Sequence, residues 1–149
     1  MPHQSTKTYG HDVGLSCAFR QWRANSHCNQ LHGYALAVRI VFGAKCLDER
    51  GWVVDFGGLK ALKLAIQDRF DHKTIVASDD PHLTWYREAE RLGILSVTEM
   101  KRTGCESFAE EIYHLATFWI QSYGDMNRCH VVSVEVKEHG ANSAIYLGA

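Results

Sequence analysis

The sequence predicts an α+β fold, in which two helices cover one face of an antiparallel four-stranded sheet. Two observations support this class: strand-like segments stand near both ends of the chain, and the long helical patterns are grouped between them. Elements grouped in this way are typical of a helix layer packed on a sheet. The predicted order is therefore ββααββ.

The first two strands are predicted over residues 9–18 and 36–42. Alternation is poor along the first, whereas LAVRIVF in the second alternates between a richly apolar face and a mixed one. A polar turn with Gly51 follows. The next short run, residues 52–56, is extended, and its Asp55 can cap the helix that comes after it.

Two main helices are predicted, over residues 57–70 and 105–124, because apolar side chains recur at helical spacing and form one stripe on each. The stripes consist of Leu59, Leu62, Ile66 and Phe70 in the first helix and of Phe108, Ile112, Leu115 and Trp119 in the second. Between them, residues 71–82 are predicted as a loop, 83–93 as a short extra helix, and 94–104 as an extended segment that turns.

The last two strands are predicted over residues 129–138 and 144–148, joined by a turn at 139–143. In the first of them, valines at every second position share one face. A four-stranded sheet of this kind has two open edges, and open edges invite pairing with further copies of the chain. A homo-oligomer is therefore expected.

Composition limits the function classes. A chain of 149 residues, 46% apolar and 22% charged, is expected to be one globular domain spanning residues 1–149. A formal net charge of −1 gives no electrostatic footprint for nucleic acid or for an anionic membrane. The polar first residues predict no signal peptide, and no apolar run is long enough to span a bilayer. Five scattered cysteines without a CxxC pair favour a reducing cytoplasm.

Five short motifs occur in an order that resembles the 6-pyruvoyltetrahydropterin synthase / 6-carboxytetrahydropterin synthase family. The resemblance covers about residues 15–146. The motifs are Cys28-x-x-Leu31-His32-Gly33, the run GWVVDFGGLK, the pair Asp71-His72, Glu106-x-x-Ala109 and the run VEVKEHG. Each motif alone is weak, but five in this order are fairly specific.

The resemblance implies the tunnelling fold, in which ββααββ subunits join their sheets into an oligomeric barrel, a tetramer or hexamer, with active sites between subunits. It also implies a dihydropterin triphosphate substrate whose side chain is polarised by a zinc ion on three histidines. Carried over by position, the thiolate base corresponds to Cys28, the acid–base pair to Asp71 and His72, the pterin anchor to Glu138, and the helix-start glutamate to Glu106.

The zinc ligands depart from the family pattern. Phe19 stands where the resemblance places the first histidine, and Tyr34 stands where it places the third, so that His32 alone remains. A catalytic zinc needs about three protein ligands, and phenylalanine cannot ligate. Zinc is therefore a doubtful cofactor here, and no other cofactor is expected. Replacement donors exist nearby in sequence: His11, Cys17, His27 and Cys28.

Each candidate also has a purely structural interpretation. Cys28 could be a small buried hydrophobic residue, and His32 a satisfied core histidine at a bulge. Asp71 and His72 could simply end the first helix, where a cationic histidine interacts well with the dipole. Glu138 could be a solvated charge at a strand end. The extra segment, about residues 79–103, could be a lid, an oligomer contact or a phosphate grip.

Three functions remain open from the sequence. The first is a pterin-processing lyase or synthase that works through thiolate and Asp/His proton transfers. The second is a non-catalytic relative that binds a pterin or purine-like ligand or serves as a scaffold. The third is a metal-independent, aldolase-like pterin enzyme, in which Tyr34 hydrogen-bonds the substrate where zinc would have polarised it.

Overall fold

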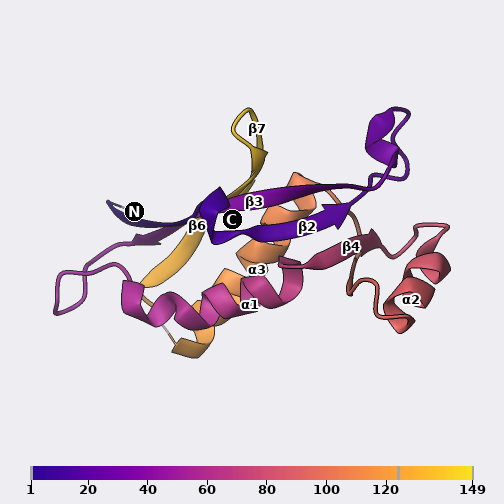
Figure 1. Ribbon diagram of the computed structural model, residues 1–149. Coiled ribbons are helices and arrows are strands. Elements are labelled where there is room, and N and C mark those ends of the chain that lie inside the picture. The colour runs from indigo at the N-terminus through magenta and orange to yellow at the C-terminus, as the bar shows by residue number, and fades with distance from the viewer. Residues whose placement is uncertain (1, 124, 149) are drawn as a thin grey trace.

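The structure is a computed structural model that describes residues 2–123 and 125–148. Its sheet is built around the long strand β3 (His32–Ala44) (Figure 1). The other strands are β1 (His3–Tyr9), β2 (Leu15–Phe19), β4 (Lys73–Ala77), β5 (Val97–Met100), β6 (Cys129–His139) and β7 (Asn142–Leu147). The helices are α1 (Lys60–Phe70), α2 (Leu83–Arg91) and α3 (Cys105–Tyr123).

The sheet confirms the α+β class but corrects the predicted strand count and direction. Within the described residues it has seven strands in the order β5-β4-β2-β3-β6-β7, with β1 also beside β3. The pairs that involve β1, β3, β6 and β7 are antiparallel, as predicted. The pairs β2–β4 and β4–β5 are parallel, so the sheet is mixed.

Two of the strands absent from the prediction have patterns that differ from half-buried alternation. β1 has the polar sequence HQSTKTY, and only its last residue, Tyr9, is buried. The sequence predicts a loop at β4 because its apolar run is short and continuous, as is typical of a strand buried on both faces. Each of these two segments is a strand because it forms backbone hydrogen bonds with a neighbouring strand, and not because of the hydrophobic pattern of its own sequence.

The weak alternation over residues 9–18 has a structural cause. β1 and β2 lie one after the other along the same edge of β3, with Tyr9 opposite Val38 and Leu15 opposite Leu36. A 3-10 turn separates the two strands and ends at Gly14, whose φ of 75° suits glycine. One predicted strand is therefore two strands with an interruption.

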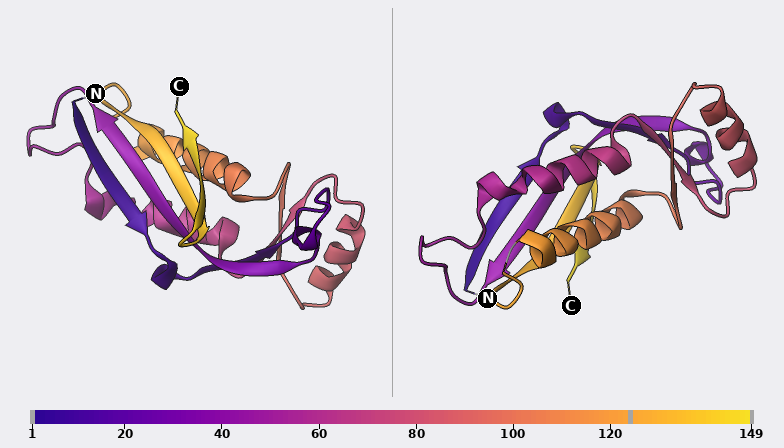
Figure 2. Two further views of the ribbon diagram at one scale, coloured as in Figure 1. Left: turned by 90° about the horizontal axis from the view of Figure 1, so that it is seen from above. Right: turned by 90° about the horizontal axis from the view of Figure 1, so that it is seen from below.

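α1 and α3 lie side by side on one face of the sheet (Figure 2). Both predicted stripes face the sheet, and only Leu115 among their residues is merely partly buried. The α1 segment begins with a 3-10 turn in which the Asp55 side chain accepts a hydrogen bond from the Gly57 amide at 2.9 Å, as the predicted cap requires. These helices hold the face of the sheet on which the candidate site lies.

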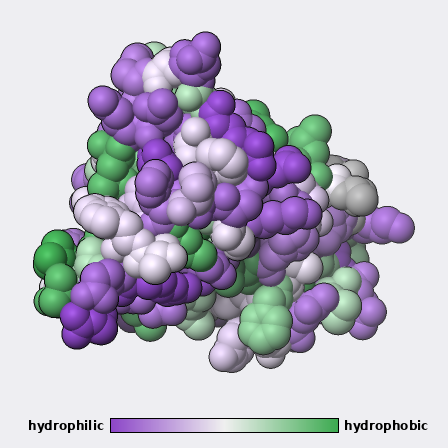
Figure 3. All heavy atoms as spheres, turned by 90° about the vertical axis from the view of Figure 1, so that its right-hand side faces the viewer, coloured by the Kyte–Doolittle hydropathy of each residue, from purple (hydrophilic) through white to green (hydrophobic). Residues whose placement is uncertain are grey.

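The predicted extra helix is confirmed as α2, which lies at the far end of the molecule with β4 and β5 (Figures 1 and 2). Both of its arginines pair with glutamates of the same helix, Arg87 with Glu90 at 3.1 Å and Arg91 with Glu88 at 2.6 Å. Their charges are therefore balanced within the helix, which disfavours a phosphate grip by these two side chains. Figure 3 shows this end as a mainly hydrophilic surface with small, separate hydrophobic patches.

In the described part of the chain, no helix combines the length and the apolar composition needed to cross a bilayer.

Candidate functional site

The pairing of β2 with β3 brings together the three positions where the resemblance places metal ligands. Phe19 lies directly opposite His32 in the register, and Tyr34 is two residues further along the same face. Ring centroids are 5.1 Å apart for Phe19 and His32, 5.9 Å for Phe19 and Tyr34, and 5.4 Å for His32 and Tyr34. The three positions thus form one aromatic cluster.

This cluster does not provide the ligands that zinc needs. Phe19 is 3% exposed and packs edge-on against Phe108 of α3, with ring centroids 5.0 Å apart. Among the residues that the structure describes, no three His, Cys, Asp or Glu side chains gather as a metal site. His11, one of the possible replacement donors, instead contacts the Ala35 carbonyl oxygen. The donor set at this point therefore does not fit a zinc ion.

The remaining histidine is nevertheless held in one orientation. The His32 Nδ1 lies 2.6 Å from the Gln30 carbonyl oxygen, an arrangement that places the proton on Nδ1. Gly33 beside it is explained by strand pairing, because a Cβ at this position would lie 3.0 Å from the Cys17 carbonyl oxygen. The lack of a side chain at Gly33 thus lets the backbone of β2 pack closely against β3.

Polar groups meet beside the aromatic cluster. A hydrogen bond to the Glu138 carboxylate raises the pKa of Tyr34, and the nearby Cys28 adds to that rise. Glu138 lies where the register between β6 and β7 shifts, between Lys137 and His139. Such irregularities aim a side chain away from regular pairing and are frequent at active sites. Tyr34 thus connects the predicted thiol base with the predicted anchor.

The first turn of α3 contributes to the same place. Burial, together with the neighbouring Glu138 and Glu106 carboxylates, raises the pKa of the Cys105 thiol to about 12. Cys105 is the first residue of α3, so Glu138 lies near the N-terminus of that helix. The sequence did not single out Cys105, since its position as the first residue of a helix gave no sign of its contact with Glu138.

Cys28 lies on the loop between β2 and β3, in a 3-10 turn that spans His27–Asn29. Its side chain is half-buried, whereas Cys46 is exposed and the other three cysteines are buried. The Ser26 Oγ accepts a hydrogen bond from the Cys28 amide at 3.3 Å. The thiol is therefore held on a structured loop and remains accessible.

Asp71 and His72 form a hydrogen-bonded pair at 2.9 Å, but they lie apart from Cys28 within one chain. Asp71 accepts a hydrogen bond from the backbone amide of Ser16 at 3.2 Å. Ser16 lies four residues before the start of the loop that carries Cys28, a distance of roughly 13 Å along an extended strand. His72 has a φ of 57° and a side chain that is 85% exposed. His72 is thus a strained, outward-facing residue, whereas the Asp71 side chain is partly buried.

Two hollows are lined by other residues of the same elements. One of about 510 Å³ is lined by Glu106, Arg102 and Tyr146 among others. Another of about 720 Å³ is lined by Leu31 of the Cys28 loop and Trp85 of α2 among others. Neither is lined by Tyr34 or Glu138, which are both partly exposed in a single chain.

The fold and the site define a two-layer α+β protein in which a carboxylate, a phenol and two thiols gather at one end of the sheet. Comparison with known families makes this more specific. Residues 11–149 match the family model of 6-pyruvoyl tetrahydropterin synthase, and the chain belongs to this family.

Known relatives agree with this assignment. The 6-carboxy-5,6,7,8-tetrahydropterin synthase of Rickettsia bellii is 40% identical over 57 residues, which are 38% of this chain and 41% of that protein. The chain therefore matches less than half the length of this relative. Its counterpart in Rickettsia conorii is 39% identical over the same share.

Solved structures show the same fold. An uncharacterized protein from Wolinella succinogenes has a TM-score of 0.81 at 22% identity, covering 99% of this chain and 98% of that one. The 6-pyruvoyl tetrahydropterin synthase of Plasmodium falciparum has a TM-score of 0.68 at 18% identity, covering 96% of both chains. The fold predicted from the resemblance is thereby confirmed.

Proposed function

We propose that the protein is a pterin-processing lyase of this family that binds a dihydropterin through Glu138 and transfers protons through Cys28. The observation that carries the proposal is the place of Tyr34, whose ring centroid lies 6.0 Å from that of His139, the neighbour of Glu138. The Glu138 carboxylate and the Cys28 thiol both act to raise the pKa of Tyr34. Those groups come from β3, β6 and the β2–β3 loop, and the motifs that contain two of them occur in the family order.

Glu138 is suited to hold the pterin ring. The amide and amino N–H groups on one edge of a pterin form a planar pair of donors, which a carboxylate can accept in two parallel bonds. The Tyr34 phenol, whose pKa is raised by its contact with the Glu138 carboxylate, helps to fix the orientation of that carboxylate.

The chemistry assigned to Cys28 is proton transfer at the pterin side chain. A thiolate on an accessible loop can take a proton from a side-chain carbon, and a nearby acid can return one elsewhere. The Asp71–His72 pair supplies that acid from a neighbouring copy, because within one chain His72 faces outward and Asp71 is held at Ser16 of β2. The proposed enzyme is accordingly a homo-oligomer, a tetramer or hexamer, and it acts in the cytoplasm.

No step of this proposal uses zinc. Phe19 fills the first ligand position with a buried ring, and the remaining donors among the described residues do not gather. The substrate is then polarised by hydrogen bonds from protein donors rather than by a metal ion.

Pterin binding tests the proposal. Neopterin and biopterin are titrated into the purified full chain, and binding is followed by quenching of pterin fluorescence. Glu138→Gln should weaken binding about 10- to 100-fold, since the loss of one charge-assisted contact is worth roughly 1.5 to 3 kcal/mol. The matched control is Glu135→Gln on the same strand, whose carboxylate pairs with Lys137 at 3.9 Å and accepts from Ser143. Equal effects of both variants, or no binding by the unmodified chain, would contradict the proposal.

A non-catalytic relative that only binds a pterin is the second candidate. The buried Phe19 favours it, because the family's metal position has become part of the core. Pterin binding without any change in the pterin absorbance spectrum over hours would identify this function. A product peak separated by chromatography would identify the lyase.

A further inference from the structure

The loop that carries Cys28 has little packing of its own. It links the end of β2 to the start of β3 over residues 20–31, and none of these residues is fully buried. Its tip is a short 3-10 turn, and Leu31 at its end is 45% exposed. The position of the Cys28 thiol therefore depends on the hydrogen bonds at the base of the loop.

Arg20 makes three of these hydrogen bonds at once. Its Nε and Nη2 donate to the two carboxylate oxygens of Asp80 at 2.9 and 2.7 Å, and its Nη1 donates to the Asn29 carbonyl oxygen at 3.1 Å. The backbone N–H of the next residue, Gln21, donates a hydrogen bond to the Cys28 carbonyl oxygen at 2.9 Å. The carbonyl groups of residues 28 and 29 are thus both bound by the first two residues of the loop.

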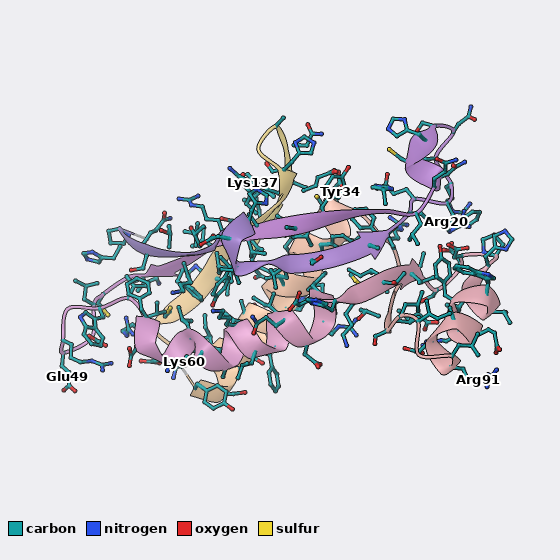
Figure 4. All side chains as sticks on the ribbon, in the orientation of Figure 1. Arg20, Tyr34, Glu49, Lys60, Arg91 and Lys137 are labelled. Carbon is teal, nitrogen blue, oxygen red and sulfur yellow. The ribbon has the colours of Figure 1, made fainter. Side chains whose placement is uncertain are left out.

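Asp80 is a fixed partner for this guanidinium. Its side chain is 1% exposed, and its Oδ1 also accepts a hydrogen bond from the His82 amide at 2.8 Å, in the turn between β4 and α2. Burial acts to raise the pKa of Asp80, but the hydrogen bonds from Arg20 and His82 outweigh it and lower that pKa. A buried, ionised carboxylate with a planar two-bond contact defines the guanidinium plane closely. Figure 4 shows Arg20 between the loop and the α2 end.

Neighbouring contacts attach the same base to the end of β5. The Thr103 hydroxyl donates to the Arg20 carbonyl oxygen at 2.7 Å. Gly104 packs so closely on Gln21 that a Cβ there would lie 2.5 Å from its Nε2, and its φ is 116°. The base of the loop therefore contacts residues at both ends of the inserted segment, the extra stretch of about residues 79–103 that contains α2.

We propose that Arg20 is a positioning residue for Cys28, which ties the thiol loop to the Asp80 turn of the inserted α2 segment. This inference rests on the proposed function for the role of Cys28 in turnover. The inserted segment thereby acquires a role, because it supplies the buried carboxylate that orients Arg20, and Arg20 holds the carbonyl next to the thiol. A displacement of about 1 Å at a reacting group can cost on the order of 100-fold in rate.

Arg20→Lys is the central test. A lysine keeps a cation beside Asp80, but its single ammonium cannot make the two-bond contact and reach the Asn29 carbonyl as well. We expect kcat for pterin turnover to fall at least tenfold with KM unchanged, because Glu138 and Tyr34 are untouched. The matched control is Arg23→Lys, whose arginine pairs with Asp79 at 3.0 Å on the exposed surface and bonds neither carbonyl.

A second readout needs no substrate. In a Cys46→Ser background, which removes the exposed thiol, alkylation by iodoacetamide reports on Cys28. Arg20→Lys should raise that alkylation rate at least threefold and should speed hydrogen exchange at the Gln21 amide. The Arg23→Lys control should do neither. Asp80→Asn, which removes the charge and keeps the shape, should shift both readouts in the same direction if Arg20→Lys fails to fold.

Two results would overturn the inference: unchanged alkylation and exchange in Arg20→Lys, or equal changes in Arg23→Lys. These readouts separate this inference from the proposed function. If the unmodified chain bound no pterin while Arg20→Lys still loosened the loop, the positioning role would stand and the proposed function would fail.

Discussion

The two neighbouring halves of the candidate site differ in their chemistry. The half made by Phe19, His32 and Tyr34 is an aromatic cluster, and its Phe19 ring packs on α3. The half made by Cys28, Cys105 and Glu138 has groups that can carry a charge or a proton. A buried ring thus occupies one position for which the resemblance implies a metal ligand, while ionisable groups lie beside it.

The difference follows from where each half lies. Phe19 faces inward from β2, so an apolar ring there adds buried area and contacts Phe108. Glu138 lies where the pairing of β6 with β7 is irregular, and Cys28 lies on a loop. Neither side chain is part of the tightly packed core. The inward half therefore contributes mainly to the stability of the fold, whereas the outward half remains accessible to a ligand.

The outward half should give the largest effect on turnover. Cys28→Ser should lower kcat about 100- to 10,000-fold, the usual contribution of a proton-transfer group, because a serine hydroxyl does not ionise near neutral pH. Thermal unfolding should be unchanged, since the loop is exposed. Cys46→Ser, at an exposed position away from the cluster, is the control and should keep full activity. Turnover by Cys28→Ser at the unmodified rate would remove Cys28 from the chemistry.

The inward half should give the largest effect on stability. Phe19→Ala should lower the free energy of unfolding by about 3 to 5 kcal/mol, because it leaves a cavity between β2 and α3. Tyr34→Phe should cost only about 1 kcal/mol, since it removes one hydroxyl near Glu138 from a partly buried position. Urea unfolding of both variants measures the contrast. Similar losses in the two would show that both positions belong equally to the core.

The thiols beneath the site predict a loss of stability that depends on pH. Burial raises the pKa of Cys17 and of Cys105 from 9.0 to about 12 in each case. Both raised values mean that the folded chain holds these protons more tightly than the unfolded chain. Their contribution is complete below pH 9 and is lost as the pH rises toward 12, on the order of 2 to 4 kcal/mol per thiol.

Urea midpoints measured from pH 8 to pH 11 check this expectation. Cys17→Ala should flatten the decline relative to the unmodified chain, whereas the exposed Cys46→Ser should leave it as it is. A stability that stays level up to pH 11 in the unmodified chain would contradict the assigned burial of these thiols.

Local periodicity in the sequence was enough to establish several parts of the molecule. The apolar stripes of α1 and α3, the short helix α2 and the Asp55 cap are all present as predicted, because each needs only residues within a few turns of one another. The five motifs in order also identified the family, which the match over residues 11–149 confirms.

Which residues meet across the sheet became known only from the folded chain. The polar β1 and the short β4 are strands because β3 and β2 offer them hydrogen-bonding edges, which no local pattern reveals. The contact of Cys105 with Glu138 joins positions 33 residues apart, and the pairing of Arg20 with Asp80 joins positions 60 apart. Long-range pairing depends on the register of whole strands, so these neighbours cannot be read from the residues around either one.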